Sequence, residues 1–164
     1  MSVKPTSCPS PSVLPSTRRT GPAPCDPRSE PGFEVALSRA TRPAGVDRVW
    51  PGLLRRAGNA CLDEWGVRGA EAARDDFGLL LTELVTNGFQ HGHGPTVRVR
   101  VWRTGRHLGI EVAGSGPAGT SPATADPADP LAESGRGLHL VGAFADTWGV
   151  SPDRTATWCL LPLG

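Results

Sequence analysis

The stretch Leu80-Leu-Thr-Glu-Leu-Val-Thr-Asn-Gly-Phe-Gln-His-Gly92 combines an apolar helical pattern with a carboxylate and a carboxamide four residues apart. A helix turns about 100° per residue, so Glu83 and Asn87 project from one face and His91 follows one turn later. The opposite face is left to apolar residues: Leu80, Leu81, Leu84, Val85 and Phe89. An acid and an amide are costly to bury without partners, so they either line the mouth of a pocket or form an ordinary solvated face.

Apolar residues at three- and four-residue spacing predict the other helices. One runs from 46 to 65, with Pro51 confining its regular part to the residues that follow, and Gly66 ends it. Its apolar residues are Val49, Leu53, Leu54, Ala57, Cys61, Leu62 and Trp65. A second helix runs from about 70 to 91 and contains the opening stretch, and a third follows Ser134-Gly-Arg-Gly137.

Alternation of apolar and polar residues predicts the strands. Residues 33–37 form a first strand, and 96–103 and 108–112 form an antiparallel hairpin with Arg98, Arg100 and Arg103 on its solvated face. Residues 147–150 and 156–163 form two closing strands around a turn at 151–154. The chain between 117 and 133 is rich in Pro, Ala, Thr and Asp and is expected to be a mobile loop.

The composition favours one domain preceded by a tail. Residues 1–32 are crowded with Pro, Ser, Thr and Gly and are expected to be disordered, although Pro-x-x-P spacings also allow a polyproline ligand. Residues 33–164 are long enough to bury a sizeable core. The formal net charge of +1 argues against nucleic-acid or membrane-surface binding, and there is no apolar run for a membrane span or a signal segment. A cytoplasmic protein is therefore expected.

Cysteine, histidine and tryptophan have ordinary structural interpretations. Cys61 and Cys159 are expected to be small buried hydrophobes, because no C-x-x-C spacing occurs. His91 and His93 lack a further ligand in sequence reach, which argues against a metal site made by them. The tryptophans are expected to pack in the core or at its edges: Trp50, Trp65, Trp102, Trp148 and Trp158.

A second motif lies near the end of the chain. Gly135 and Gly137 directly precede a helix, so backbone N–H groups and the helix N-terminus could approach a phosphate, although the same pattern also makes a plain tight turn. With the order of the parts, these motifs resemble the histidine-kinase-like ATPase superfamily, in particular its branch of bacterial anti-sigma-factor serine kinases of actinobacterial type. The resemblance lies in Glu83-Leu-Val-Thr-Asn87 with His91-Gly92, in Gly135-Arg-Gly-Leu138 with Val141 and 145–149, and in Trp158-Cys-Leu-Leu-Pro162.

The resemblance implies a fold, cofactors and residue roles. The fold is a two-layer α/β sandwich of Bergerat type, a mixed, mainly antiparallel sheet covered on one face by about three helices. The cofactors are ATP and Mg²⁺, with Asn87 as the metal ligand and Glu83 as the general base. The remaining nucleotide contacts fall on His91, Gly116, Gly135, Arg136, Gly137 and Leu138, and residues 117–133 form a lid.

Two positions depart from the family pattern. The middle box normally carries an aspartate that binds the adenine amino group, and Gly114 stands there. The closing strand normally carries a threonine two residues before the tryptophan, where this chain has Ala156; Thr155 and Thr157 are expected to point to the opposite face. Losing both hydrogen bonds is expected to weaken nucleotide binding about a hundredfold or more.

The expected function is that of an ATP-dependent serine/threonine kinase that phosphorylates an anti-sigma-factor antagonist, with a sigma factor as a further or alternative protein partner. The alternative is a degenerate, non-catalytic module that binds a regulatory partner with weak or no ATP binding. The catalytic domain of a two-component histidine kinase is a third candidate, disfavoured because no helix carries a phosphoacceptor histidine. The sequence leaves open whether the protein forms a homodimer; in the family that it resembles, the first strand and first helix are where members tend to pair.

Overall fold

The computed structural model describes residues 17–20, 32–39, 49–67, 71–92, 94–114 and 136–163. Six strands form one sheet in the order β1-β5-β6-β4-β3-β2. The β1–β5 pair is parallel and the other four pairs are antiparallel. The strands are β1 (Thr17–Thr20), β2 (Gly32–Ser38), β3 (Thr96–Thr104), β4 (His107–Gly114), β5 (Thr147–Val150) and β6 (Ala156–Pro162).

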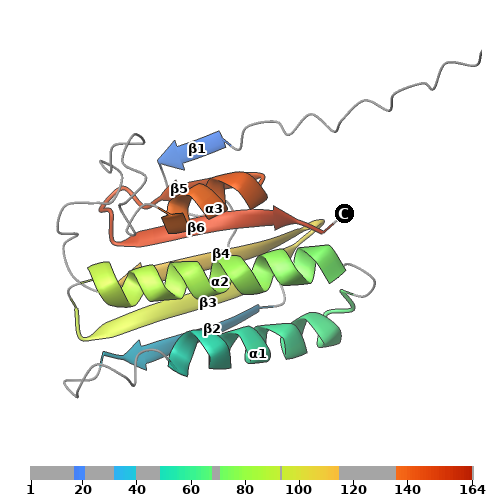
Figure 1. The fold of residues 1–164 in the computed structure, drawn as a ribbon, viewed down its shortest axis with the longest axis horizontal. Helices are drawn as coiled ribbons and strands as arrows, with labels where there is room; N and C mark the ends of the chain where they lie inside the picture. The colour runs from blue at the N-terminus through green and yellow to red at the C-terminus, as the bar shows by residue number, and fades with distance from the viewer. Residues whose placement is uncertain are drawn as a thin grey trace, which may run out of the picture.

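Three helices cover one face of this sheet: α1 (Val49–Glu64), α2 (Glu71–His91) and α3 (Arg136–Phe144) (Figure 1). The central helix α2 packs on β3, β4 and β6 and has α1 and α3 as neighbours. The predicted two-layer sandwich with a mixed, mainly antiparallel sheet is therefore confirmed. We call the face of the sheet that carries no helix the open face.

The core lies between α2 and the sheet, as the opening stretch predicted. Its apolar residues Leu80, Leu81, Leu84, Val85 and Phe89 are buried. They face alternate residues of β3 and β4, namely Val97, Val99, Val101, Leu108, Ile110 and Val112, which are buried too. This alternation gives the predicted hairpin one apolar face, and its two-residue loop begins at Gly105, where φ is +52°.

The helix α1 differs from its prediction in the face that it buries. Its buried residues are Pro51, Leu54, Gly58 and Leu62, whereas Val49 and Leu53 are exposed. Gly58 explains the difference, because a Cβ there would lie 2.7 Å from the Phe77 ring, so the ring packs directly on the helix backbone. Pro51 lies inside the first turn, where a missing N–H costs no intrahelical bond.

Gly66 ends α1 as predicted. Its φ is +70°, and its N–H donates to the Asp63 carbonyl at 3.1 Å. The next N–H, of Val67, donates to the Leu62 carbonyl at 2.9 Å. These two bonds form a Schellman motif, which satisfies carbonyls that the helix leaves free.

The second half of β3 corrects the expected arginine face. Arg98 and Arg100 lie on the open face, but the next residue on that face is Trp102 rather than an arginine. Arg103 lies on the helix face, where its guanidinium donates to the Trp65 carbonyl beyond the end of α1. Strict alternation thus places the third arginine at a helix C-terminus, where a cation is favourable.

Two further expectations need correction. Residues 17–20 belong to the stretch expected to be disordered, yet they form the edge strand β1, which pairs with β5 through backbone bonds that require no apolar pattern. The rest of 1–31 lies outside the described residues. Cys159 is fully buried, which raises its pKa to about 12, whereas Cys61 is only half-buried.

Candidate nucleotide site

The residues Glu83, Asn87 and His91 lie one turn apart along α2, and we call them the acid–amide stripe. All three are half-buried, beside a core-facing side that is closed to solvent. The Nε2 atom of His91 is buried and has no hydrogen-bond partner among the described residues. The stripe is therefore neither a fully solvated face nor a set of satisfied core residues.

The helix α3 supports the neighbouring part of the site. It begins at Arg136, its residue Val141 is fully buried, and it packs on α2 and β5. Leu138 is half-buried against the core, so the N-terminal turn of α3 is anchored beside α2. The predicted contacts Gly116 and Gly135, together with His93 and the loop 117–133, lie outside the described residues.

Three glycines bring the end of α2 against the end of β4. A Cβ built on Gly114 would lie 2.9 Å from the Cα of Gly92 and 3.4 Å from the carbonyl oxygen of Gly88. A Cβ on Gly88 would lie 2.8 Å from Cγ1 of Val112. The two backbones touch at this glycine contact (Gly88, Gly92 and Gly114), so the position where the family carries its aspartate has no room for a side chain.

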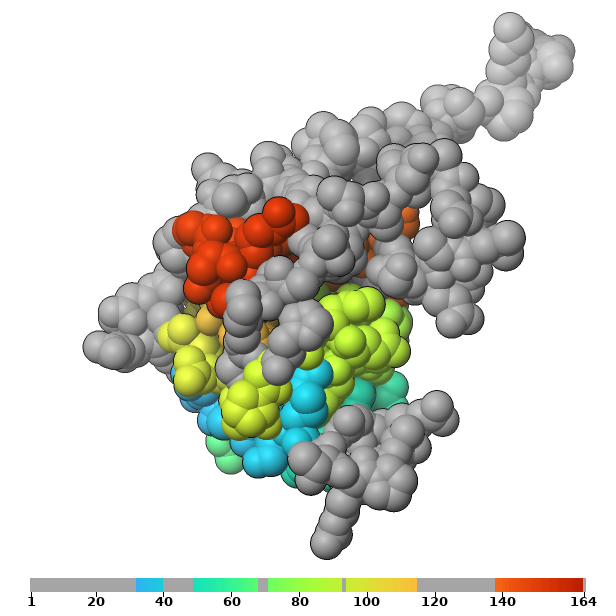
Figure 2. Space-filling view, turned by 90° about the vertical axis from the view of Figure 1, so that its left-hand side faces the viewer, coloured from blue at the N-terminus to red at the C-terminus, as the bar shows by residue number. Residues whose placement is uncertain are grey.

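Arg39 closes the same end of α2. Its Nη2 atom donates to the Gly88 carbonyl at 2.7 Å, its Nη1 atom donates to the Phe89 carbonyl, and its guanidinium lies 5.9 Å from the centre of the Phe89 ring. Figure 2 shows the end of β2 (cyan) beside the end of α2 (yellow-green) on this side of the molecule. Sequence reasoning missed Arg39, because nothing local signals a helix cap that comes from 49 residues away.

The face assigned to the closing strand must be corrected. Thr157 pairs with Val112, and that valine lies in the helix-side core. Thr157 therefore shares the helix face with Gly114, whereas Ala156 and Trp158 lie on the open face. The sequence-based prediction placed the adenine contact of β6 on the face that carries Trp158, whereas the helix face is the one that borders the candidate site. Thr157 is half-buried and is the residue of β6 that can present a hydroxyl beside the glycine contact.

The turn between β5 and β6 fixes this edge of the site. The Asp153 carboxylate accepts hydrogen bonds from the Ser151 hydroxyl at 2.6 Å and from the Thr155 N–H at 3.2 Å and hydroxyl at 2.9 Å. These bonds, led by that of Ser151, lower the pKa of Asp153. The Thr155 carbonyl in turn accepts the Gly114 N–H at 3.0 Å, so the turn is tied to the glycine contact.

The 145–149 segment of the last motif does not reach the stripe. Asp146 lies just before β5 and its Oδ2 atom is 2.9 Å from Nε2 of His107, the first residue of β4. Gly114 is the last residue of the same strand, so this contact between Asp146 and His107 lies at the opposite end of the strand from the glycine contact. Asp146 is exposed and is best understood as a surface partner of His107.

The side chains suit a magnesium nucleotide at one end of the site better than at the other. The described residues contain no group of three or more His, Cys, Asp and Glu that could hold a metal ion. An amide oxygen such as that of Asn87 suits Mg²⁺ when phosphates and waters supply its remaining ligands. At the glycine contact, by contrast, the position where the family carries its adenine-binding aspartate is Gly114, which has no carboxylate.

The chain belongs to the family of histidine kinase-like ATPase domains, whose pattern it matches over residues 49–160. That match spans α1 to β6 and includes the acid–amide stripe, the start of α3 and the closing strand. A search of curated proteins found no match to this chain. No helix within the described residues is long and apolar enough to cross a membrane.

Proposed function

We propose that this protein is an ATP-dependent serine/threonine kinase that phosphorylates an anti-sigma-factor antagonist. The observation that carries the proposal is the acid–amide stripe: a carboxylate and an amide one turn apart, half-buried, on a helix of a histidine kinase-like ATPase domain. Desolvation of a carboxylate beside an apolar core is costly unless a hydrogen-bond partner offsets it, and the hydroxyl of a bound substrate would be such a partner for Glu83. The resemblance of this chain's motifs to those of the anti-sigma-factor kinase branch supports an anti-sigma-factor antagonist as the substrate.

Two residues of the stripe, Glu83 and Asn87, have a chemical task, and the first turn of α3 adds a third contact. ATP with Mg²⁺ supplies the phosphoryl group and neutralises its charge when bound. Asn87 offers an amide oxygen to the metal, and the Glu83 carboxylate accepts the proton of the attacking serine or threonine hydroxyl. The backbone N–H groups in the first turn of α3, at Arg136, Gly137 and Leu138, have no intrahelical partners and suit phosphate oxygens.

Replacement of Glu83 tests the proposal. The variants Glu83→Ala and Glu83→Gln should lower phosphotransfer to a cognate antagonist about 10²- to 10⁴-fold, the usual contribution of a general base. Glu71→Ala is the matched control, because Glu71 is an exposed acid in the first turn of the same helix. The measurement is the single-turnover rate with saturating Mg-ATP. Unchanged rates in both Glu83 variants would rule out the assigned base.

A second candidate function is a binding module that keeps the scaffold without using nucleotide. The backbone contact between Gly92 and Gly114 favours it, because this contact leaves no space for the carboxylate that selects adenine in the family. Such a module would sequester a sigma factor or an antagonist directly. Titration with Mg-ATP separates the two functions: saturable binding in the micromolar range supports the kinase, and no binding at millimolar nucleotide supports the module.

A further inference from the structure

Arg39 places a guanidinium beside the position where the family carries its aspartate. Its Nη2 atom donates to the Gly88 carbonyl oxygen at 2.7 Å, and that oxygen would lie 3.4 Å from a Cβ on Gly114. A Cβ on Gly92 would lie 2.6 Å from the same Nη2 atom and 3.1 Å from the Gly114 Cα. We call these surroundings of the glycine contact the base end of the site. The base end has a cation where the family pattern has an anion.

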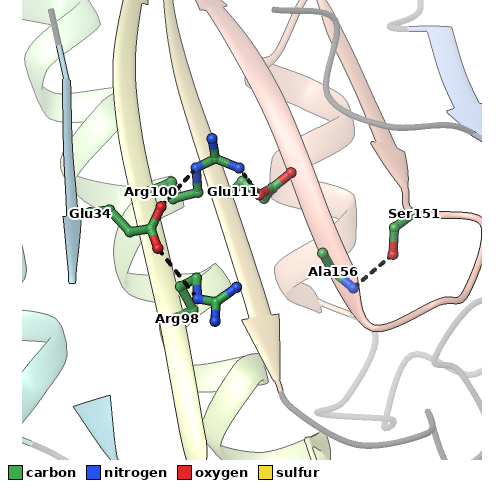
Figure 3. Close-up of polar contacts among 6 residues, drawn as sticks. All are labelled: Glu34, Arg98, Arg100, Glu111, Ser151 and Ala156. Carbon is green, nitrogen blue, oxygen red and sulfur yellow. Dashed lines mark hydrogen bonds and ion pairs between the residues drawn. The ribbon is translucent and has the colours of Figure 1, made fainter. Parts of the chain in front are cut away.

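The charge of Arg39 is not neutralised by a carboxylate. Arg98 and Arg100, on the open face, form ion pairs with Glu34 at 3.3 and 3.2 Å, and Arg100 also pairs with Glu111 at 3.2 Å (Figure 3). Within the described ranges, by contrast, no carboxylate forms an ion pair with Arg39. The carbonyl end of α2 supplies only about half an elementary charge, so the base end remains positive.

The carbonyl groups that could take over from the missing carboxylate are already engaged. The Gly88 carbonyl accepts both the Gly92 N–H at 3.1 Å and the Arg39 guanidinium, which uses both of its lone pairs. The Phe89 carbonyl also accepts a hydrogen bond from Arg39. Adenine carries an amino group at C6, which is a donor. An amino group bound here would therefore compete with Arg39 for these carbonyl oxygens.

Donors, in contrast, remain at the base end. An arginine has five N–H groups and no acceptor. Arg39 donates twice to α2, and its Nε atom is buried and has no hydrogen-bond partner among the described residues. The Thr157 hydroxyl on β6 can donate or accept, so it does not distinguish one base from another. A keto oxygen at C6 of a purine accepts hydrogen bonds and therefore matches Arg39, whereas an amino group does not.

From these observations we infer that Arg39 makes the base end selective for a 6-oxopurine, so that the protein binds Mg-GTP at least as tightly as Mg-ATP. The inference rests on the proposed function, because it concerns the nucleotide beside the acid–amide stripe. The tasks of Glu83 and Asn87 stay the same, since the triphosphate and the magnesium ion are common to both nucleotides. The phosphoryl donor of the proposed kinase is then a guanine nucleotide as well as ATP.

Calorimetric titration of the full chain with Mg-ATP, Mg-GTP and Mg-ITP tests the inference without any substitution. Inosine triphosphate has the keto oxygen of guanine but lacks its amino group, so it isolates the contact at C6. We expect Mg-GTP and Mg-ITP to bind alike and at least as tightly as Mg-ATP. Tighter binding of Mg-ATP than of both others would overturn the inference and leave the proposed kinase intact. No binding of any of the three at millimolar concentration would overturn the proposed function together with the inference.

Replacement of Arg39 tests the role of its guanidinium. Arg39→Met keeps an unbranched side chain, removes every donor and frees the Gly88 carbonyl for an amino group. The ratio of GTP affinity to ATP affinity should fall about 10-fold or more, the effect of one hydrogen bond to a charged group. Arg39→Lys keeps a cationic donor and should retain most of the ratio.

Arg103→Met is the matched control, because Arg103 donates to the Trp65 carbonyl at the end of α1, away from the site. It should leave the ratio unchanged. The ratio is the informative quantity, since loss of a helix cap alone would weaken both nucleotides equally. An unchanged ratio in folded Arg39→Met would overturn the assignment to Arg39. If that variant does not fold, the three titrations of the wild type and the ratio in Arg39→Lys decide.

Discussion

The acid–amide stripe and the glycine contact both involve α2, yet they depend on different parts of the structure. The stripe is a property of one helix: Glu83 and Asn87 are four residues apart, and any regular helix presents them together. The glycine contact depends on two elements, since Gly88 and Gly92 of the α2 end meet Gly114 of β4. The residues proposed to bind magnesium and phosphate can therefore be retained while the surroundings of the adenine base change with the packing of α2 on the sheet. The predictions below test this separation.

The largest effect in this comparison is expected from Gly114→Asp. The new Cβ would lie 2.9 Å from the Gly92 Cα, and the carboxylate would face the carbonyl end of α2, where negative charge is unfavourable. We expect a loss of stability of about 1 to 3 kcal/mol, the usual range for overpacking, and no gain in Mg-ATP affinity. Urea denaturation measures the loss of stability, and calorimetric titration measures the affinity for Mg-ATP.

The neighbouring variant Ala113→Asp is the control for that substitution. Ala113 pairs with Ala156 on the open face and so keeps the added charge away from α2. Its stability should stay near the wild-type value. A folded Gly114→Asp protein that binds Mg-ATP more tightly than wild type would contradict this account. It would show that the position can accommodate the aspartate found in the family.

A smaller effect is expected from Thr157→Val. Thr157 lies on the helix face beside the glycine contact, so its hydroxyl is the group of β6 available to a bound base. Loss of one hydrogen bond of about 0.5 to 1.5 kcal/mol should weaken Mg-ATP binding roughly 2- to 10-fold. Thr157→Ser should retain the affinity. Ala156→Thr, on the open face, should not change it, and a tighter complex with this variant would restore the original assignment of the closing strand.

The smallest effect is expected from acid acting on the β5–β6 turn. The pKa of Asp153 is lowered in the folded protein, so its contribution to stability is present above the ordinary aspartate pKa of about 3.9 and is lost as the pH falls through the lowered value. In Asp153→Asn this part of the pH dependence should disappear. Urea midpoints of the two proteins should differ at neutral pH and converge in acid. Parallel curves down to pH 3 would contradict the role of the carboxylate.

Much of the fold was accessible from sequence because its elements follow from local patterns. The burial of Leu80, Leu84 and Phe89 follows from helical spacing, and the β3–β4 hairpin follows from alternation around a glycine. Local patterns failed where a distant residue sets the outcome. The buried face of α1 depends on the Phe77 ring over Gly58, and β1 exists only through its pairing with β5.

The candidate site shows the same division. The spacing of Glu83 and Asn87 was enough to place them on one face. The sequence of β6 alone did not show which of its faces borders the candidate site. Alternation sorts the residues of a strand into two faces, but it does not tell which of the two faces the helices. Arg39 was missed for the related reason that it caps α2 from another strand end.

The central claim is that the acid–amide stripe holds a magnesium nucleotide although the base end lacks its carboxylate. The most direct measurement is a calorimetric titration of the full chain with ATP, with and without Mg²⁺, beside the Asn87→Ala variant. We expect saturable, magnesium-dependent binding in the micromolar range for the wild type and its loss in Asn87→Ala. No heat of binding at millimolar Mg-ATP, or equal binding by the variant, would contradict the claim.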